Sequence, residues 1–191
     1  MEFTIGAVLL VAVVFAAYAL WTFNRLIALR TRADNAWSDI DVQLKRRWDL
    51  VPRLVDTVRG YTSHEQQTLE RATKARTGAQ RASSLIRRAE AESMLGDATV
   101  RLLAIAEAYP ELKASDLFLR LQGELVEVED HLQHARRYYN AIARDLNTVI
   151  AQFPPSIIAR LAGFKQREFF GLDDPAEAGA PSVGKPLGER T

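Results

Sequence analysis

Few ionisable side chains have a spacing that could support chemistry, and one group has the spacing of a metal site. Glu127, His131 and His134 fall at positions i, i+4 and i+7 of a helical stretch, so they share one side of that helix. Carboxylate and imidazole groups bind metals, and helical bundles hold metals with such side chains. The surrounding acids, and the lack of identifiable ligands on a facing helix, favour a solvated charged face. We therefore expect neither a metal nor a cofactor.

A second motif resembles the start of a zinc-protease helix. His64 and Glu65 begin that motif, but Thr68 occupies the position of the second histidine. The chain contains no cysteine, which excludes thiolate nucleophiles, cysteine-ligated metals and disulfides. The sequence also has no phosphate-binding loop, dinucleotide fingerprint or nucleophile elbow. We predict that the protein is not an enzyme and that it has no small-molecule substrate.

One charged residue interrupts an apolar stripe. Arg47 lies on a stripe that begins at Ala33 and continues to Tyr61 in steps of three and four. We favour an arrangement in which the Arg47 stem covers apolar neighbours while its guanidinium group reaches water. The alternative is a pair with an acid of the last long helix, which would offset the cost of burying the charge and fix the register of the helices.

Long helices must position these residues. No Gly or Pro lies between Gly6 and Pro52, so we expect an N-terminal span to continue into the first helix of the domain. Pro52 either kinks that helix or lies in the first turn of a fresh helix that Asp49 caps. Ser63 followed by Gln66 fits a capping box, which predicts a second helix that starts after Ser63 and runs through Arg76, and a third helix spans roughly residues 86–109 before a proline.

The last long helix has the most regular pattern. An unbroken repeat of apolar residues runs from Phe118 to Phe153 and stops at Pro154. No alternation typical of strands is present anywhere in the sequence. We predict an all-α fold in which a transmembrane helix leads into an antiparallel four-helix bundle with coiled-coil packing.

The N-terminal segment has the length and composition of a membrane span. Residues 5–23 contain no charge, and at about 1.5 Å per residue they would cover most of the ~30 Å hydrocarbon core. No positive residue precedes them, which favours an anchor over a cleaved signal peptide. Arg25, Arg30 and Arg32 follow directly, so the positive-inside rule predicts an outward N-terminus and a cytoplasmic domain on the cell (inner) membrane.

The chain ends in an amphipathic stretch followed by a biased tail. We predict a short amphipathic helix over residues 157–170, which either contacts anionic lipid or packs on the end of the bundle. The expected parts are an anchor over residues 1–24, a bundle over 25–170 and a disordered tail over 171–191. The candidate lipid-contacting or end-packing residues are Ile157, Ile158, Leu161, Phe164, Lys165, Phe169 and Phe170.

Three blocks of sequence resemble the LemA family. They are NAWSDIDVQLKRRWDLVPRLVDTVRGYTSHE at 35–65, RRYYNAIARDLNTVIAQFP at 136–154 and IIARLAGFKQREFF at 157–170. The resemblance implies a membrane anchor followed by an antiparallel helical bundle, and work linked to a membrane. It carries no catalytic set. The residues that match its pattern and that we take as candidates for interaction or helix register are Asn35, Asp39, Asp41, Arg46, Arg47, Tyr139, Asn140 and Asn147.

Composition limits the partners. The 25 basic and 24 acidic residues nearly cancel, so the chain lacks the basic field that nucleic-acid binders use. We therefore expect a membrane-anchored, non-enzymatic scaffold or adaptor that contacts the lipid bilayer and either a protein partner or copies of itself. The alternative is a lipid-interacting protein that remodels membranes or responds to envelope stress.

Overall fold

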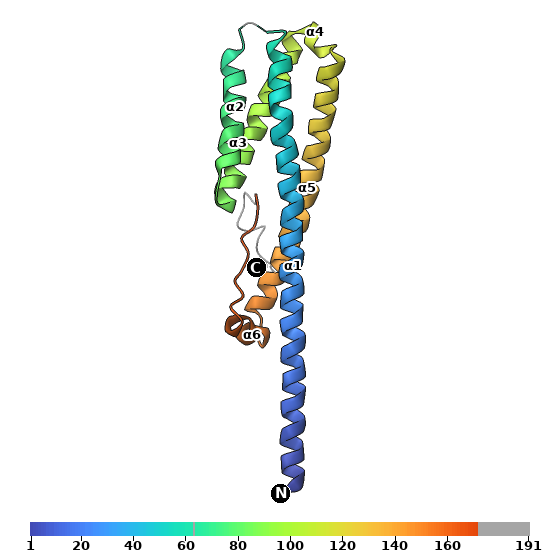
Figure 1. Ribbon diagram of the computed structural model, residues 1–191, viewed down its shortest axis with the longest axis vertical. Helices are drawn as coiled ribbons and strands as arrows, with labels where there is room; N and C mark the ends of the chain where they lie inside the picture. Colours follow the sequence, from blue (N-terminus) through green and yellow to red (C-terminus); the bar gives the residue numbers. More distant parts are fainter. Residues whose placement is uncertain (63, 172–191) are drawn as a thin grey trace, which may run out of the picture.

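The structure is a computed structural model that describes residues 1–62 and 64–171, and all regular elements of this part of the chain are helices (Figure 1). The prediction of an all-α chain that begins with a long apolar helix is confirmed. The elements in chain order are α1 (Glu2–Arg59), α2 (Gln66–Arg81), α3 (Leu85–Ala104), the 3-10 helix η1 (Ile105–Ala108), α4 (Pro110–Lys113), α5 (Asp116–Ala151) and α6 (Pro155–Leu161).

Helix α1 is continuous from the apolar N-terminal segment to the far end of the domain. It passes through Pro52, so the expectation that a fresh helix starts at Asp49 is wrong. Among the described residues, α1 alone is long and apolar enough to cross a membrane, and its most apolar stretch is not covered by the rest of the chain. In Figure 1 this stretch extends bare below the domain.

The domain is built from two antiparallel helix pairs. Helix α5 runs back along α1, and this pair makes the most extensive contact in the domain. Helices α2 and α3 form a hairpin that packs on α1 mainly through α2. Ser84 and Ser115 cap the N-termini of α3 and α5. Their hydroxyl groups accept hydrogen bonds from the backbone N–H groups of Arg87 and Phe118, which fixes where these helices start.

The core lies mainly along the α1–α5 seam. Ile40, Leu44 and Leu54 of α1 and Val128 and Leu132 of α5 are completely buried, as the apolar repeats predicted. The repeat fails at its end, because α5 stops at Ala151 and Phe153 is 78% exposed. A closed four-helix bundle is not confirmed, because α3 and α5 do not pack on each other as closely as the two pairs do.

The predicted amphipathic helix over residues 157–170 is only partly correct. Helix α6 ends at Leu161, and Gly163 follows with a φ of 72°, a left-handed conformation that glycine adopts without a Cβ clash. Residues 164–171 then run without helical structure back toward the middle of the domain (Figure 1). We call residues 164–171 the strap. Most of the predicted disordered tail, residues 172–191, lies outside the described residues.

Candidate functional site

Two asparagines of α5 hold the strap through its backbone. The Asn147 side chain donates to the carbonyl of Arg167 and accepts from its N–H, both at 2.8 Å. Asn140 pairs with the carbonyl and N–H of Phe170 in the same way, at 3.1 and 2.9 Å. A side-chain amide offers one donor and one acceptor side by side, so it satisfies both backbone groups of an extended residue at once.

The spacing of the two asparagines matches the spacing of the strap. Asn140 and Asn147 lie two helical turns apart on one face of α5, a distance of about 10 Å. Arg167 and Phe170 are three residues apart, and an extended chain also covers about 10 Å in that number. We call these four hydrogen bonds from Asn140 and Asn147 the clasp. The clasp requires an extended strap, which explains why the helix predicted over residues 157–170 does not continue through residues 167–170.

The end of the strap is anchored in an aromatic cluster. The Phe170 side chain is completely buried, and its ring meets the edge of the Trp37 ring with centroids 5.2 Å apart. The Arg136 guanidinium lies 5.0 Å from the centre of the same ring. Tyr139 packs edge-on to Trp37 and donates its hydroxyl to the carbonyl of Glu168 at 2.9 Å. Burial raises the pKa of Tyr139 above its ordinary value of 10.0, so its hydroxyl stays a donor to a higher pH than that of an exposed tyrosine.

Arg47 joins three helices. One guanidinium nitrogen lies 3.4 Å from a Glu92 carboxylate oxygen of α3, and another lies 3.3 Å from a Glu129 oxygen of α5. The Arg47 side chain is only 7% exposed, so the favoured expectation that its head group reaches water is wrong. A Cβ at Gly96 would lie 2.9 Å from this guanidinium, so the glycine provides the space that the charge occupies.

Glu92 is the most deeply buried acid of this network. Its side chain is fully buried, and Trp48 donates its indole N–H to one carboxylate oxygen at 2.7 Å. Desolvation raises the pKa of Glu92, while the Trp48 hydrogen bond and the charge of Arg47 oppose that rise. Both carboxylate oxygens already have a donor, so the group supports the structure and is poorly placed to act on a substrate.

Pro52 creates a binding point for α2. Proline has no N–H, so the carbonyl of Trp48, four residues earlier in α1, lacks its normal helical donor. The guanidinium Nε of Arg76 in α2 donates to this carbonyl at 2.7 Å. The proline that interrupts the hydrogen bonding of α1 thus provides an acceptor by which the α2–α3 hairpin is attached.

A hollow of about 690 Å³ lies between α3, α5 and the strap. Its walls include Arg47, Glu92 and Glu129 from the ion-pair network and Phe169 from the strap. Of the two alternatives for Phe169 and Phe170, the structure favours packing over lipid contact, because Phe170 is buried in the core and Phe169 packs against it. Of the candidate residues, Phe164 also packs on the domain, against the Leu26–Leu146 cluster.

The remaining candidate residues lie outside the clasp. Asp41 pairs with Arg88 of α3 at 3.2 Å and with Lys45 at 2.9 Å. Asn35 is exposed on α1. Lys165 is also exposed, on the strap.

A mixed-charge surface follows the seam between α1 and α5. Arg46 of α1 pairs with Glu127 of α5 at 3.2 Å, and Glu127 also lies 3.6 Å from His131. Asp39, Val42 and His131 line one shallow hollow on the same seam. We call this group the seam surface, and its members are Asp39, Val42, Arg46, Glu127 and His131. Within the part of the chain that the structure describes, no cluster of three His, Cys, Asp or Glu residues is arranged to hold a metal.

Sequence reasoning missed several residues of the network. Glu92 lies among other charged residues of α3, and nothing in its spacing distinguishes it from a surface acid. The free carbonyl of Trp48 could have been inferred from Pro52, because a mid-helix proline implies an unpaired carbonyl four residues earlier, but nothing in the sequence identifies Arg76 as its donor. One feature of the sequence could have indicated the strap contacts of Asn140 and Asn147: the two amide side chains recur at a heptad interval beside the apolar repeat.

Comparison with known families identifies the chain. The LemA family pattern matches residues 36–184, a region that contains every element from the second half of α1 to the strap. The chain belongs to the LemA family. The clasp, the Arg47 network and the seam surface are therefore features of a LemA-family domain.

Curated relatives of this LemA-family chain include magnetosome proteins. Magnetosome protein MamQ 2 of Paramagnetospirillum magneticum is 26% identical, over 83% of this chain and 68% of the relative. Magnetosome protein MamQ of Magnetospirillum gryphiswaldense has the same identity and coverage. Protein LemA of Metamycoplasma hominis is 29% identical, over 72% of this chain and 63% of the relative. With the apolar part of α1, these relatives indicate that the protein is associated with a membrane.

Proposed function

We propose that this LemA-family protein is a membrane-anchored, non-enzymatic scaffold that binds a protein partner or copies of itself. One observation carries the proposal: α1 is a single helix whose apolar half is bare and whose other half forms the core of the domain. Because no linker separates the two halves, the domain is held at a set height and angle above the bilayer. A domain held in this way presents the same surface to a partner at a constant distance from the membrane, as a scaffold requires.

The seam surface is the site that we assign to the partner. It combines an exposed apolar side chain, Val42 at 58% exposure, with acidic, basic and imidazole groups from two helices. Mixed charge of this kind favours selective contact with another protein over binding to nucleic acid. Along the seam α1 and α5 pack closely on each other through buried residues such as Ile40 and Val128, so the surface is formed without a partner.

We also propose that the anchor lies in the cell (inner) membrane with the N-terminus outside and the domain in the cytoplasm. The basis is the placement of Arg25, Arg30 and Arg32 directly after the apolar stretch. The alternative function, a direct action on lipid, is supported by the exposed apolar side chains around α6.

Photo-crosslinking in native membranes tests the scaffold function. A photoreactive amino acid replaces Val42 in the full-length chain, and the matched control replaces Met94 of α3, which is 66% exposed. We expect a discrete adduct, either a dimer or a complex with one other protein, from position 42 and none from position 94. Monomers alone from position 42, together with a monomeric size and no co-purifying protein in mild detergent, would contradict the proposal.

A further inference from the structure

Three apolar side chains are exposed together where α5 passes into α6. Phe153 is 78% exposed, Ile157 50% and Leu161 85%. Ile157 and Leu161 are four residues apart, so they lie on one face of α6. The opposite face carries Pro155 and Ala159, which are buried against the domain. We call Phe153, Ile157 and Leu161 the α6 patch.

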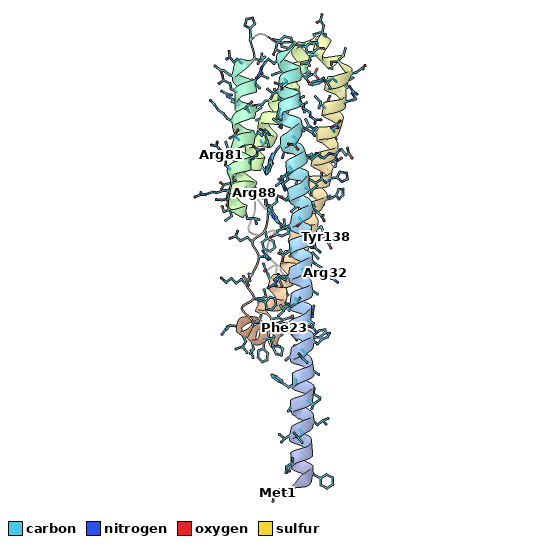
Figure 2. The ribbon with its side chains drawn as sticks, in the orientation of Figure 1. Met1, Phe23, Arg32, Arg81, Arg88 and Tyr138 are labelled. Carbon is cyan, nitrogen blue, oxygen red and sulfur yellow. The ribbon has the colours of Figure 1, made fainter. Side chains whose placement is uncertain are left out.

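The α6 patch lies at the level where the apolar stretch of α1 ends. Ala159 of α6 belongs to a buried cluster with Leu26 and Leu29 of α1. Phe164, three residues after α6, places its ring centre 6.1 Å from that of Phe23, the last residue of the apolar stretch. Figure 1 shows α6 as the lowest part of the domain beside the bare part of α1, and Figure 2 labels Phe23 at the same level.

With the apolar stretch of α1 in a bilayer, α6 would lie at the depth of the headgroup layer. The layer extends about 5–8 Å beyond the hydrocarbon core on each side of a bilayer. If Phe23 marks the edge of the core, the contact between Phe23 and Phe164 keeps the start of the strap within that depth. Exposed apolar side chains at this depth meet lipid rather than bulk water.

The charges around the patch favour anionic lipid. Arg25, Arg30 and Arg160 are exposed at this end of the domain, and the Arg25 guanidinium lies 5.5 Å from the centre of the Trp21 ring. One acid, Asp145, lines a hollow with Arg25. An aromatic belt and exposed basic groups beside an apolar patch are the features with which proteins bind the boundary between anionic headgroups and acyl chains.

We propose that the α6 patch is a second membrane contact, in which Phe153, Ile157 and Leu161 are immersed in the headgroup region of a bilayer that contains anionic phospholipid. The domain is then held by the span and by α6 together, at two points instead of one. This inference does not depend on whether the seam surface binds a protein.

The absence of cysteine allows a direct test, because a single introduced cysteine can be labelled specifically. The full-length chain with Ala162→Cys, at an exposed position next to the patch, carries a polarity-sensitive fluorophore. It is reconstituted into vesicles of phosphatidylglycerol and phosphatidylcholine with nitroxide groups on the lipid headgroups or shallow acyl positions. The matched control is Val126→Cys, an exposed position on α5 nearer its start. We expect blue-shifted emission and severalfold stronger lipid-nitroxide quenching at position 162 than at position 126.

A second variant separates immersion from simple proximity. Phe153→Ser, Ile157→Ser and Leu161→Ser together in the Ala162→Cys chain should abolish most of that quenching, while circular dichroism confirms that the helices remain. Equal quenching at positions 162 and 126 would overturn the proposal. So would a label that is shielded from an aqueous quencher without being quenched by lipid nitroxides, because this result would show that protein covers the patch. Unchanged quenching in the triple-serine chain would overturn it as well.

Discussion

At the scale of single residues, Arg47 shows how this domain accommodates a charge in its core. A buried guanidinium is tolerable only when its hydrogen bonds are satisfied, and here Glu92 and Glu129 approach it from two other helices. Gly96 leaves the space, and Trp48 supplies Glu92 with a further donor. The charge therefore links α1, α3 and α5 at a point where α3 and α5 make little direct contact.

Removal of this charge should cost much more than removal of its neighbour. Arg47→Met leaves the buried Glu92 without its cationic partner, so we expect the free energy of unfolding to fall by about 3 kcal/mol. Arg46→Met is the matched control, because Arg46 and Glu127 form an exposed pair worth at most about 1 kcal/mol. Denaturant unfolding of the full-length chain in detergent measures both. Equal losses for the two variants would show that the buried pair does not stabilise the domain.

Glu92 should also give the domain a characteristic pH dependence. Its pKa in the folded protein lies above the ordinary value of 4.5, so the folded chain binds this proton more tightly than the unfolded chain. The associated stability is complete below that ordinary pKa and is lost as the pH rises through the raised value. Relative to Glu92→Gln, which cannot titrate, the wild-type thermal midpoint should therefore decline as the pH rises above 4.5 and through the raised pKa of Glu92. A constant difference between the two midpoints across this range would contradict the assignment.

At the scale of helices and segments, the strap depends on side-chain amides instead of a helix or sheet partner. Asn140 and Asn147 provide four hydrogen bonds to two strap residues, and α5 supplies both amides from one face. The strap therefore has a defined path although it contains no regular structure.

Loss of one amide should loosen the strap locally. Asn147→Ala removes two hydrogen bonds of about 1 kcal/mol each, which corresponds to roughly a thirtyfold change in the opening equilibrium. Hydrogen exchange at the amide of Arg167 should accelerate accordingly, and trypsin should cleave faster after Lys165. Asn35→Ala, at an exposed position of α1, is the control and should leave both rates unchanged. Unaltered exchange in Asn147→Ala would show that the clasp does not hold the strap.

The link between Pro52 and Arg76 can be tested as a pair. Arg76→Met leaves the Trp48 carbonyl without a donor, and we expect a loss of about 1.5–3 kcal/mol in unfolding free energy. Pro52→Ala restores the helical N–H to that carbonyl, so Arg76→Met should cost distinctly less in this background. Denaturant unfolding of the four chains gives the coupling energy. Additive effects would mean that Arg76 acts through something other than this carbonyl.

The helices were predictable to different degrees. The apolar repeats of α1 and α5 identify their buried residues because each helix packs along one continuous stripe. Leu44 and Leu132, one from each stripe, are completely buried. The strap was not predictable from periodicity, since its fold depends on backbone contacts to Asn140 and Asn147 that leave no pattern in residues 164–171. The burial of Arg47 was missed because Glu92 gives no sign in the sequence that it faces inward.

At the scale of the whole molecule, the bare part of α1 and the packed part must lie in different environments. An impermeant maleimide should label Thr4→Cys in intact cells with a permeable outer layer, because Thr4 is near the outward N-terminus of the proposed orientation. Val126→Cys, on exposed α5, should react only after the cells are lysed. The reverse labelling pattern would place the domain on the outside and overturn the orientation, although the fold would be unaffected.

Synthesis from the N-terminus delivers the two sides of the main core at different times. The core side chains of α1 are made first, whereas their α5 partners follow roughly ninety residues later, as Ile40 and Leu132 illustrate. At a synthesis rate of about 5–20 residues per second, the nascent α1 waits roughly 5–20 s for α5. During that interval the apolar stripe of α1 lacks the α5 side chains that cover it in the folded domain.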